Sequence, residues 1–317
     1  MKQVHIYYHG DLDGIFSAIL YGKLFTDNGA NKLRFKFSSV NYHLKNWQTD
    51  VLPKDADTQV AVVDFLYNPT ADVWYDHHQS GLGVHTIDQV TTQGAYDGTA
   101  PSCAQVIYNQ EGRDAYKDET LVKKIVEDVN MVDYAMYPTV ESVYSTERWS
   151  PMLRMALLEQ GNAEFFNEII RMGIFDRTFF YKLLEGKLPW GAEWRYAKYK
   201  HALDIGYAKF KEVAEIKANV VHYTDPPYVK TDRYFAYRLE PSADFTVYVK
   251  DFTWRGHGAH VGVSKNPWKP KKAINLKELA EVYGGGGHQD VAGITCTSLE
   301  EAEGIKTKIL EELIRVP

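Results

Sequence analysis

Residues 9–20, HGDLDGIFSAIL, join an alternating run of polar residues directly to an apolar helix. His9, Asp11 and Asp13 stand at every second position after QVHIYYH (3–9), a segment whose composition predicts a strand. Because residues two apart in an extended chain point to the same side, we expect these three side chains on one side of the strand's exit. The apolar residues that follow recur at helical spacing up to an Asn-Gly stop, so the stretch predicts a strand, a ligand-bearing loop and a helix.

Further strands are predicted within the first hundred residues. Residues 33–37 alternate, QVAVVDF (59–65) is an unbroken apolar run suited to a strand buried on both faces, and DVWYD (72–76) follows it. From residue 101 to about residue 185 the pattern is mostly helical. Strands and helices in this order predict an α/β domain, a parallel sheet with helices on both faces.

The second half of the chain predicts a smaller α+β domain after a long charged helix at 187–215. Its strand-like segments are 218–224, 232–239, 244–252, 259–264 and 291–296, and its predicted helices are 275–284 and one that opens with the capping-box pair Ser298 and Glu301. The expected boundaries are 1–190 for the first domain, 191–215 for a helical linker and 216–317 for the second domain. We expect the active site in a cleft between the two domains, and the role of the helical region 135–200 stays open.

The composition predicts a globular protein without a membrane span. Of the 317 residues 44% are hydrophobic and 25% charged, and no run of 18 apolar residues occurs. The two cysteines fit neither a disulfide framework nor a zinc site, which favours the cytoplasm. The net charge of -6 argues against a protein that coats nucleic acid through overall basicity. A basic segment at 264–273, with four lysines around Trp268, is compatible with a phosphate-binding surface or with a solvated loop.

Acids and histidines also follow the two later strands of the first domain. Asp64 ends one of them, and Asp76 ends the next, directly before His77 and His78. Parallel sheets bind ligands beyond the carboxyl ends of their strands, so these residues are expected to converge with those of the first strand. Converging carboxylates repel one another unless cations neutralise them. A set of aspartates and histidines without cysteine suits manganese, magnesium or iron, and manganese is our first choice.

Four motifs together resemble the DHH phosphoesterase superfamily with its DHH-associated C-terminal domain. They are HGDLDG, the strand ending in VVDF, YDHHQSG and GGGGHQDVAG, which occur in the family's order across most of the chain. Members of this family include RecJ-like exonucleases, nanoRNases that also dephosphorylate 3'-phosphoadenosine 5'-phosphate, cyclic-dinucleotide phosphodiesterases, polyphosphatases and type II pyrophosphatases. The resemblance implies two metal ions per site, commonly Mn²⁺, with Mg²⁺ as the alternative.

The resemblance also implies which residues hold the metals. The two sets, which share Asp64 as a bridging ligand, are His9, Asp11 and Asp64, and Asp13, Asp64 and His77. The family has a further aspartate after the helical segment that follows the DHH motif. Asp133 in NMVDYA is the best match to it, and Asp128 is the competitor. Asp76 is expected to orient the histidines beside it rather than to bind metal.

Other motif residues are expected to act on the substrate. His78, beside a ligand, would hydrogen-bond the scissile phosphate or the leaving oxygen, and with Asp76 it makes up the expected catalytic pair. Glycine amides can approach a phosphate closely. The glycine run therefore predicts a clamp for the far end of the substrate, formed by Gly285, Gly286, Gly287 and His288.

Two features depart from the family's pattern. Many nanoRNase-like members place the first histidine further from the aspartates than HGDLD does, which is closer to the RecJ-like arrangement. Many members also carry a serine followed closely by arginine, whereas VGVSKNPW offers Ser264 and Lys265, and lysine lacks the bidentate fork of arginine. Lys265 is still expected to contact the substrate. Further side chains that could contact a base or phosphate are Trp268, Tyr283, His257 and His260.

The sequence therefore predicts a manganese-dependent phosphodiesterase. It would hydrolyse short or single-stranded oligonucleotides to 5'-mononucleotides with water activated by two metal ions, and could also act on 3'-phosphoadenosine 5'-phosphate. The alternatives are a pyrophosphatase or polyphosphatase, a cyclic or linear dinucleotide phosphodiesterase, and a nucleotide-binding regulator without catalysis. The sequence implies no obligate protein partner and no membrane, and leaves a homodimer open.

Overall fold

The computed structural model describes residues 1–30, 32–42, 44, 46–78, 80–159, 162–252 and 258–316. The chain divides into two compact units. The N-terminal unit comprises Met1–Tyr137 and Tyr144–Tyr199, and the C-terminal unit comprises Pro138–Val143 and Lys200–Pro317.

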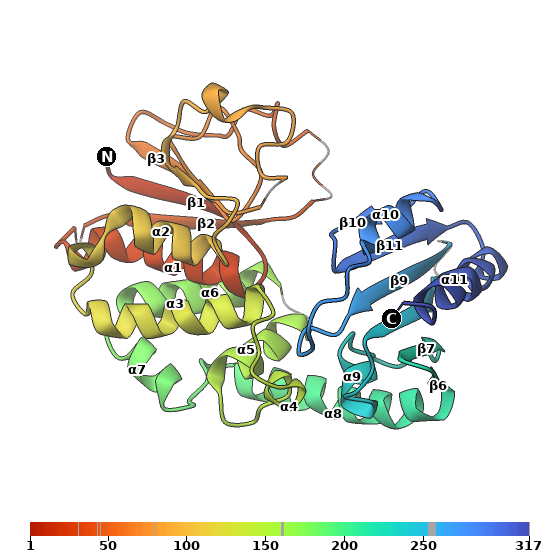
Figure 1. Ribbon diagram of the computed structural model, residues 1–317. Coiled ribbons are helices and arrows are strands. Elements are labelled where there is room, and N and C mark those ends of the chain that lie inside the picture. The colour runs from red at the N-terminus through yellow and green to blue at the C-terminus, as the bar shows by residue number, and fades with distance from the viewer. Residues whose placement is uncertain are drawn as a thin grey trace. The chain divides into compact units, whose positions relative to one another are not determined.

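The N-terminal unit is built on a parallel sheet, as predicted, and this sheet has five strands (Figure 1). Its order is β2-β1-β3-β4-β5, and every neighbouring pair is parallel. The strands are β1 (Gln3–His9), β2 (Arg34–Val40), β3 (Thr58–Val63), β4 (Val73–Asp76) and β5 (Gln93–Tyr96). Only β5 had no clear sequence signal, because QGAY is short and largely exposed. The parallel arrangement places the carboxyl ends of all five strands at one edge.

Helices cover one face of this sheet in the described residues (Figure 1). Helices α1 (Leu12–Asp27), α2 (Cys103–Glu111) and α6 (Ala163–Phe175) pack on the strands, and α3 (Glu119–Asp133) packs on α1 and α2. We expected helices on the second face too. That face is instead sealed by large aromatic side chains from the loops between β2 and β5, including Trp47 and Tyr67, together with the short η1 (Ile87–Gln89).

The remaining elements of the helical region are short. They are η2 (Arg113–Ala115), α4 (Val140–Val143), α5 (Trp149–Leu158) and α7 (Phe179–Leu184). The long charged helix is α8 (Ala192–Val213), which runs from the last residues of the N-terminal unit into the C-terminal unit. Among the described residues, no helix combines the length and apolarity needed to cross a membrane.

The described residues of the C-terminal unit form a six-stranded mixed sheet of order β10-β11-β9-β8-β7-β6, in which β7 and β8 pair in parallel and the other neighbouring pairs are antiparallel. The strands are β6 (Glu215–Lys217), β7 (Val220–Thr224), β8 (Phe245–Asp251), β9 (Ala259–Lys265), β10 (Gly286–Gly287) and β11 (Val291–Cys296). Helices α10 (Leu276–Glu281) and α11 (Leu299–Leu313) bury their apolar sides against this sheet. The Ser298 hydroxyl caps α11 by accepting from the Glu301 amide at 3.1 Å, as predicted.

One predicted strand was wrong. Residues 232–239 contain helix α9 (Phe235–Leu239), not a strand. Asp232 starts the turn, because its side chain accepts from the Tyr234 amide at 2.9 Å and its carbonyl accepts from the Phe235 amide at 3.1 Å. The aromatic run resembles a strand in composition, but consecutive buried residues have no period that separates a buried helix from a buried strand.

Candidate metal centre

The first loop of the centre is shaped by its own polar residues. Asp11 is the N-cap of α1, and its carboxylate accepts from the Gly14 amide at 3.0 Å. A Cβ atom at Gly14 would lie 2.1 Å from the His9 carbonyl oxygen, so only glycine lets the helix begin this close to β1. The HGDLDG motif thus converts a strand into a helix within two residues and keeps its acids at the strand end.

Asp13 is fixed by a second helix. Its carboxylate accepts from the backbone amides of Cys103 at 2.6 Å and Ala104 at 2.9 Å, which are the first amides of α2. The positive end of the α2 dipole therefore faces this acid. Asp13 is 1% exposed, so the start of α2 holds it in the interior at the carboxyl edge of the sheet.

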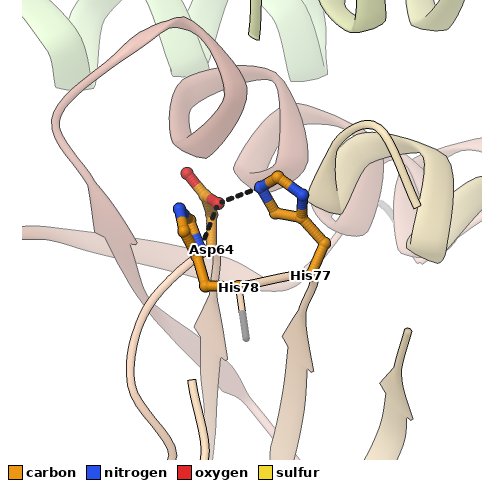
Figure 2. A group of neighbouring side chains, drawn as sticks. All are labelled: Asp64, His77 and His78. Atoms are coloured by element: carbon orange, nitrogen blue, oxygen red, sulfur yellow. Dashed lines mark ion pairs between the residues drawn. The ribbon is translucent and has the colours of Figure 1, made fainter. Parts of the chain in front are cut away.

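Asp64 lies directly after β3, at the centre of the cluster. It is 1% exposed, and neither of its carboxylate oxygens has a hydrogen-bond partner among the described residues. Figure 2 shows its carboxylate between two imidazoles: Oδ1 lies 3.6 Å from Nε2 of His77 and 3.6 Å from Nδ1 of His78. Its φ of 57° lies in the left-handed region, and such backbone strain in a non-glycine residue is concentrated at functional sites. A buried carboxylate without donors is suited to a cation.

The two histidines after β4 are each held in orientation through their Nδ1 atoms. Nδ1 of His77 lies 3.1 Å from the Ala100 carbonyl oxygen, which leaves Nε2 facing the acids. Nδ1 of His78 lies 2.8 Å from Oδ1 of the fully buried Asp76, and the same oxygen accepts from the His77 amide at 2.9 Å. Asp76 therefore lies behind the histidines, where a carboxylate sets ring orientation.

The structure brings all six expected ligands together with His78. Three groups each have their ligand atoms within 4.8 Å of one another: His9, Asp11 and Asp64; Asp13, His77 and Asp133; and Asp64, His77 and His78. The first group is one of the two expected metal sets. The second group has Asp133 where the other expected set has Asp64, and Asp64 lies with His77 in the third group. Asp128 lies elsewhere: it is 5% exposed and its Oδ1 is 2.5 Å from Nη2 of Arg148.

The electrostatics of the cluster favour a bound cation. Burial, with repulsion from Asp13 and Asp11, raises the pKa of Asp64 well above its usual range, and burial also raises the pKa of Asp13. In the described part of the chain, the ion pairs of these three aspartates are with histidines only. Oxygen and imidazole donors of this kind suit divalent metals, so the residues fit the expected Mn²⁺ or Mg²⁺ pair.

Two residues of the site were missed from the sequence. Tyr42 follows β2, and its ring centroid lies 5.3 Å from that of His9. Gly81 lies against Asp76, because a Cβ atom there would be 1.8 Å from Oδ2 of that carboxylate. The rule that ligands bind beyond strand ends, applied to β2 as it was to the other strands, would have found Tyr42.

Some backbone amides of the expected clamp in the C-terminal unit already donate hydrogen bonds within that unit. The amide of Gly285 donates to the Ala280 carbonyl at 3.0 Å, and that of His288 donates to the Val291 carbonyl at 2.7 Å. Gly287 needs the freedom of glycine, since its φ is 142° and a Cβ atom would lie 2.5 Å from the Val291 carbonyl oxygen. A Cβ atom at Gly286 would meet nothing within 4 Å, and the His288 side chain is exposed.

The lysines of the basic segment are paired with acids of the same unit. Nζ of Lys265, whose side chain is 2% exposed, lies 2.9 Å from Asp290 and 3.0 Å from the Lys272 carbonyl oxygen. Lys271 also pairs with Asp290, and Lys269 and Lys272 both pair with Asp244. These pairs neutralise much of the positive charge that the sequence suggested.

The aromatic and histidine candidates near that segment have structural contacts of their own. Trp268 packs on Tyr234 and Tyr237, with ring centroids 5.5 and 6.2 Å away. Tyr283 is partly buried against the core of the unit. His260 lies on β9, and His257 lies outside the described residues.

No protein-family model and no curated protein matches the sequence. Solved structures do resemble it. The pGpG-specific phosphodiesterase PggH from Vibrio cholerae has a TM-score of 0.73 and 17% identity over the whole of both chains. RecJ from Thermus thermophilus in complex with Mn²⁺ has a TM-score of 0.58 and 14% identity, covering all of this chain and 52% of RecJ. An exonuclease RecJ bound to manganese has a TM-score of 0.55 and 14% identity, covering all of this chain and 91% of that one. At these identities the likeness is one of fold.

Proposed function

Because this chain has the fold of the DHH phosphoesterase superfamily, we propose that it is a metal-dependent phosphodiesterase that cleaves short oligonucleotides to 5'-mononucleotides. The observation that carries the proposal is the Asp64 carboxylate. It is buried, lacks hydrogen-bond partners among the described residues, and lies at the carboxyl edge of a parallel sheet with two histidines 3.6 Å away.

The cofactor we propose is a pair of Mn²⁺ ions, with Mg²⁺ as the alternative; RecJ structures with each ion share the fold. When bound, such a pair activates water near neutral pH and neutralises the phosphoryl oxygens. The residues that would hold it are His9, Asp11, Asp13, Asp64, His77 and Asp133.

His78 would act on the substrate rather than on the metal, and Asp76 would orient its ring. Burial disfavours the imidazolium, but the hydrogen bond and charge of Asp76 outweigh burial and raise the pKa of His78 to about 9 in the metal-free protein. In the protonated ring, which this contact favours, Nδ1 is engaged by Asp76 and Nε2 would donate to the scissile phosphate or protonate the leaving oxygen.

A 5'-phosphorylated linear dinucleotide is the substrate that we favour. PggH is described as specific for pGpG, a molecule of this class. Within the C-terminal unit, the residues to which we assign substrate contacts are Gly285, Gly286, Gly287, His288 and Lys265, of which Lys265 pairs with Asp290. The unit that follows the helical linker at 191–215 is thus assigned to substrate binding. We place the enzyme in the cytoplasm, since both cysteines are buried and free.

Product chromatography tests the proposal. The purified protein is incubated with Mn²⁺ and, in turn, pGpG, a longer single strand, 3'-phosphoadenosine 5'-phosphate and pyrophosphate. Asp64→Asn serves as the control, because asparagine keeps the shape and tolerates a left-handed φ. Mononucleotide from pGpG, absent in the control, supports the proposal. Phosphate from pyrophosphate alone would instead establish a pyrophosphatase, and inactivity on all four would favour a binding protein.

A further inference from the structure

Tyr42 is an exposed aromatic residue at the rim of the metal centre. It follows β2 at the carboxyl edge of the sheet, and 49% of it is accessible to solvent. Its ring borders two residues of the cluster, with centroids 5.3 Å from His9 and 6.4 Å from His78. Metal binding and catalysis account for the acids and histidines of the site, but they do not account for the half-exposed tyrosine beside them.

The ring of Tyr42 has a rigid support on one side. Phe65, which is fully buried, lies 4.9 Å away, and Trp47 packs on Phe65 at 5.2 Å. The Trp47 indole donates to the Leu66 carbonyl at 2.7 Å, which fixes this aromatic layer to the backbone after β3. The tyrosine is therefore held in place although it is exposed.

No described ring lies parallel to that of Tyr42. Phe65, His9 and His78 meet it at 50°, 67° and 75°. Such tilted and edge contacts leave the flat surface of the ring available, so a partner could still stack on it. The accessible half of the ring is thus suited to another planar group.

We propose that Tyr42 forms a nucleobase subsite, in which the base of the nucleotide whose phosphate occupies the metal centre stacks on the tyrosine ring. This inference rests on the proposed function. A phosphate beside His9 and His78 carries its base only one sugar away, and Tyr42 is the aromatic neighbour common to both histidines. Stacking is tolerant of base identity but stronger for larger ring systems, so the subsite favours purines over pyrimidines.

The test is calorimetric binding of 5'-GMP, 5'-UMP and inorganic phosphate in the presence of Mn²⁺, followed by KM and kcat for pGpG. Tyr42→Leu removes the ring, and Tyr42→Phe retains it without the hydroxyl. Tyr181→Leu is the matched control, because Tyr181 is 51% exposed and bonds Asp118, the N-cap of α3. Helix α3 has 15 residues and ends at Asp133, so its start lies about 20 Å from the centre.

We expect Tyr42→Leu to weaken GMP binding about 10-fold, equivalent to ~1.4 kcal/mol, with a matching rise in KM for pGpG. The change for phosphate should be much smaller, and Tyr42→Phe should restore the preference for GMP over phosphate. Equal losses for GMP and phosphate, or GMP affinity equal to that of the wild type, would overturn the subsite. Tyrosine-dependent GMP binding without hydrolysis of any nucleotide would preserve the subsite and refute the proposed function.

Discussion

Asp64→Asn should stabilise the metal-free protein. The wild-type carboxylate is 1% exposed and has no hydrogen-bond donor among the described residues, while Asp11 and Asp13 lie close enough to raise its pKa. Asparagine removes the charge, keeps the volume and tolerates the left-handed φ of 57°. The substitution therefore relieves a repulsion that a bound cation or a proton must relieve in the wild type.

The size of the effect follows from the burial of this group. A buried polar group without a hydrogen bond lowers the free energy of unfolding by about 1–3 kcal/mol, and by more when it is charged. The asparagine side chain is neutral but still polar, so it retains part of this cost. We expect a net gain of about 1–2 kcal/mol, which in a unit of this size raises Tm by about 2–8 °C. Manganese at 100 times its Kd should stabilise the wild type by about 2.7 kcal/mol and the variant by much less.

The pH dependence gives a second measure of the same repulsion. The folded pKa of Asp64 is raised above its unfolded value of 3.8, so its contribution to stability is fully present below that value and is lost as pH rises through the folded pKa. The loss is at most about 1.4 kcal/mol per pH unit for one proton. In EDTA, the advantage of the variant should therefore widen from acid to neutral pH.

The assay is thermal unfolding of both proteins in EDTA and in Mn²⁺, from pH 4.5 to 8. Asp57→Asn is the control: Asp57 immediately precedes β3 at the end opposite Asp64, is 51% exposed and pairs only with the surface Lys2 among the described residues. The expected result is a reversal, with Asp64→Asn more stable in EDTA and the wild type more stable in Mn²⁺. If the variant is the less stable protein in EDTA and gains as much from manganese as the wild type, the reasoning on Asp64 is wrong.

Three other predictions test separate parts of the structure. Asp133→Asn should reduce the Tm rise caused by manganese together with kcat, whereas Asp128→Asn, which removes the negative charge that pairs with Arg148, should cost about 1–2 kcal/mol of stability and leave the manganese response intact. Gly81→Ala puts a Cβ atom 1.8 Å from a carboxylate oxygen and should lower kcat about 100-fold, while Gly304→Ala, with nothing within 4 Å in α11, should not lower it. His5→Leu should remove a loss of stability that occurs in acid. Burial, with a nearby lysine, lowers the pKa of His5 to about 4, so up to about 3 kcal/mol of the free energy of unfolding is present above pH 6.5 and is lost as pH falls from 6.5 to 4. Equal pH profiles of the two proteins in denaturant titrations would contradict this.

Local sequence patterns predicted most of the N-terminal sheet. Alternation and apolar runs predicted four of the five strands, and the polar residues at their ends predicted which side chains converge, because parallel strands present their carboxyl ends at one edge. The HGDLDG motif even specifies its own turn, through the Asp11 cap and the glycine at position 14. These features depend on neighbours within a few residues, so the chain alone encodes them.

Helix rotation and burial needed the tertiary structure. Asp128 and Asp133 both occur on α3, but residues five apart on a helix point in different directions. The packing of α3 therefore decides that Asp133 meets His77 and Asp128 meets Arg148. Lys265 was expected at the substrate, yet its burial beside Asp290 depends on the pairing of β9 with β11.

The sequence by itself determined the parallel sheet, the strand-end acids and histidines, and hence the class of metal that suits them. Only the tertiary structure decided that Asp64 is left without a hydrogen-bond donor among the described residues and that Tyr42 stands half exposed beside the histidines. The physical reason is that residue type and spacing specify which groups reach a strand end, whereas solvation, partners and ring orientation depend on segments distant in the chain that pack around it.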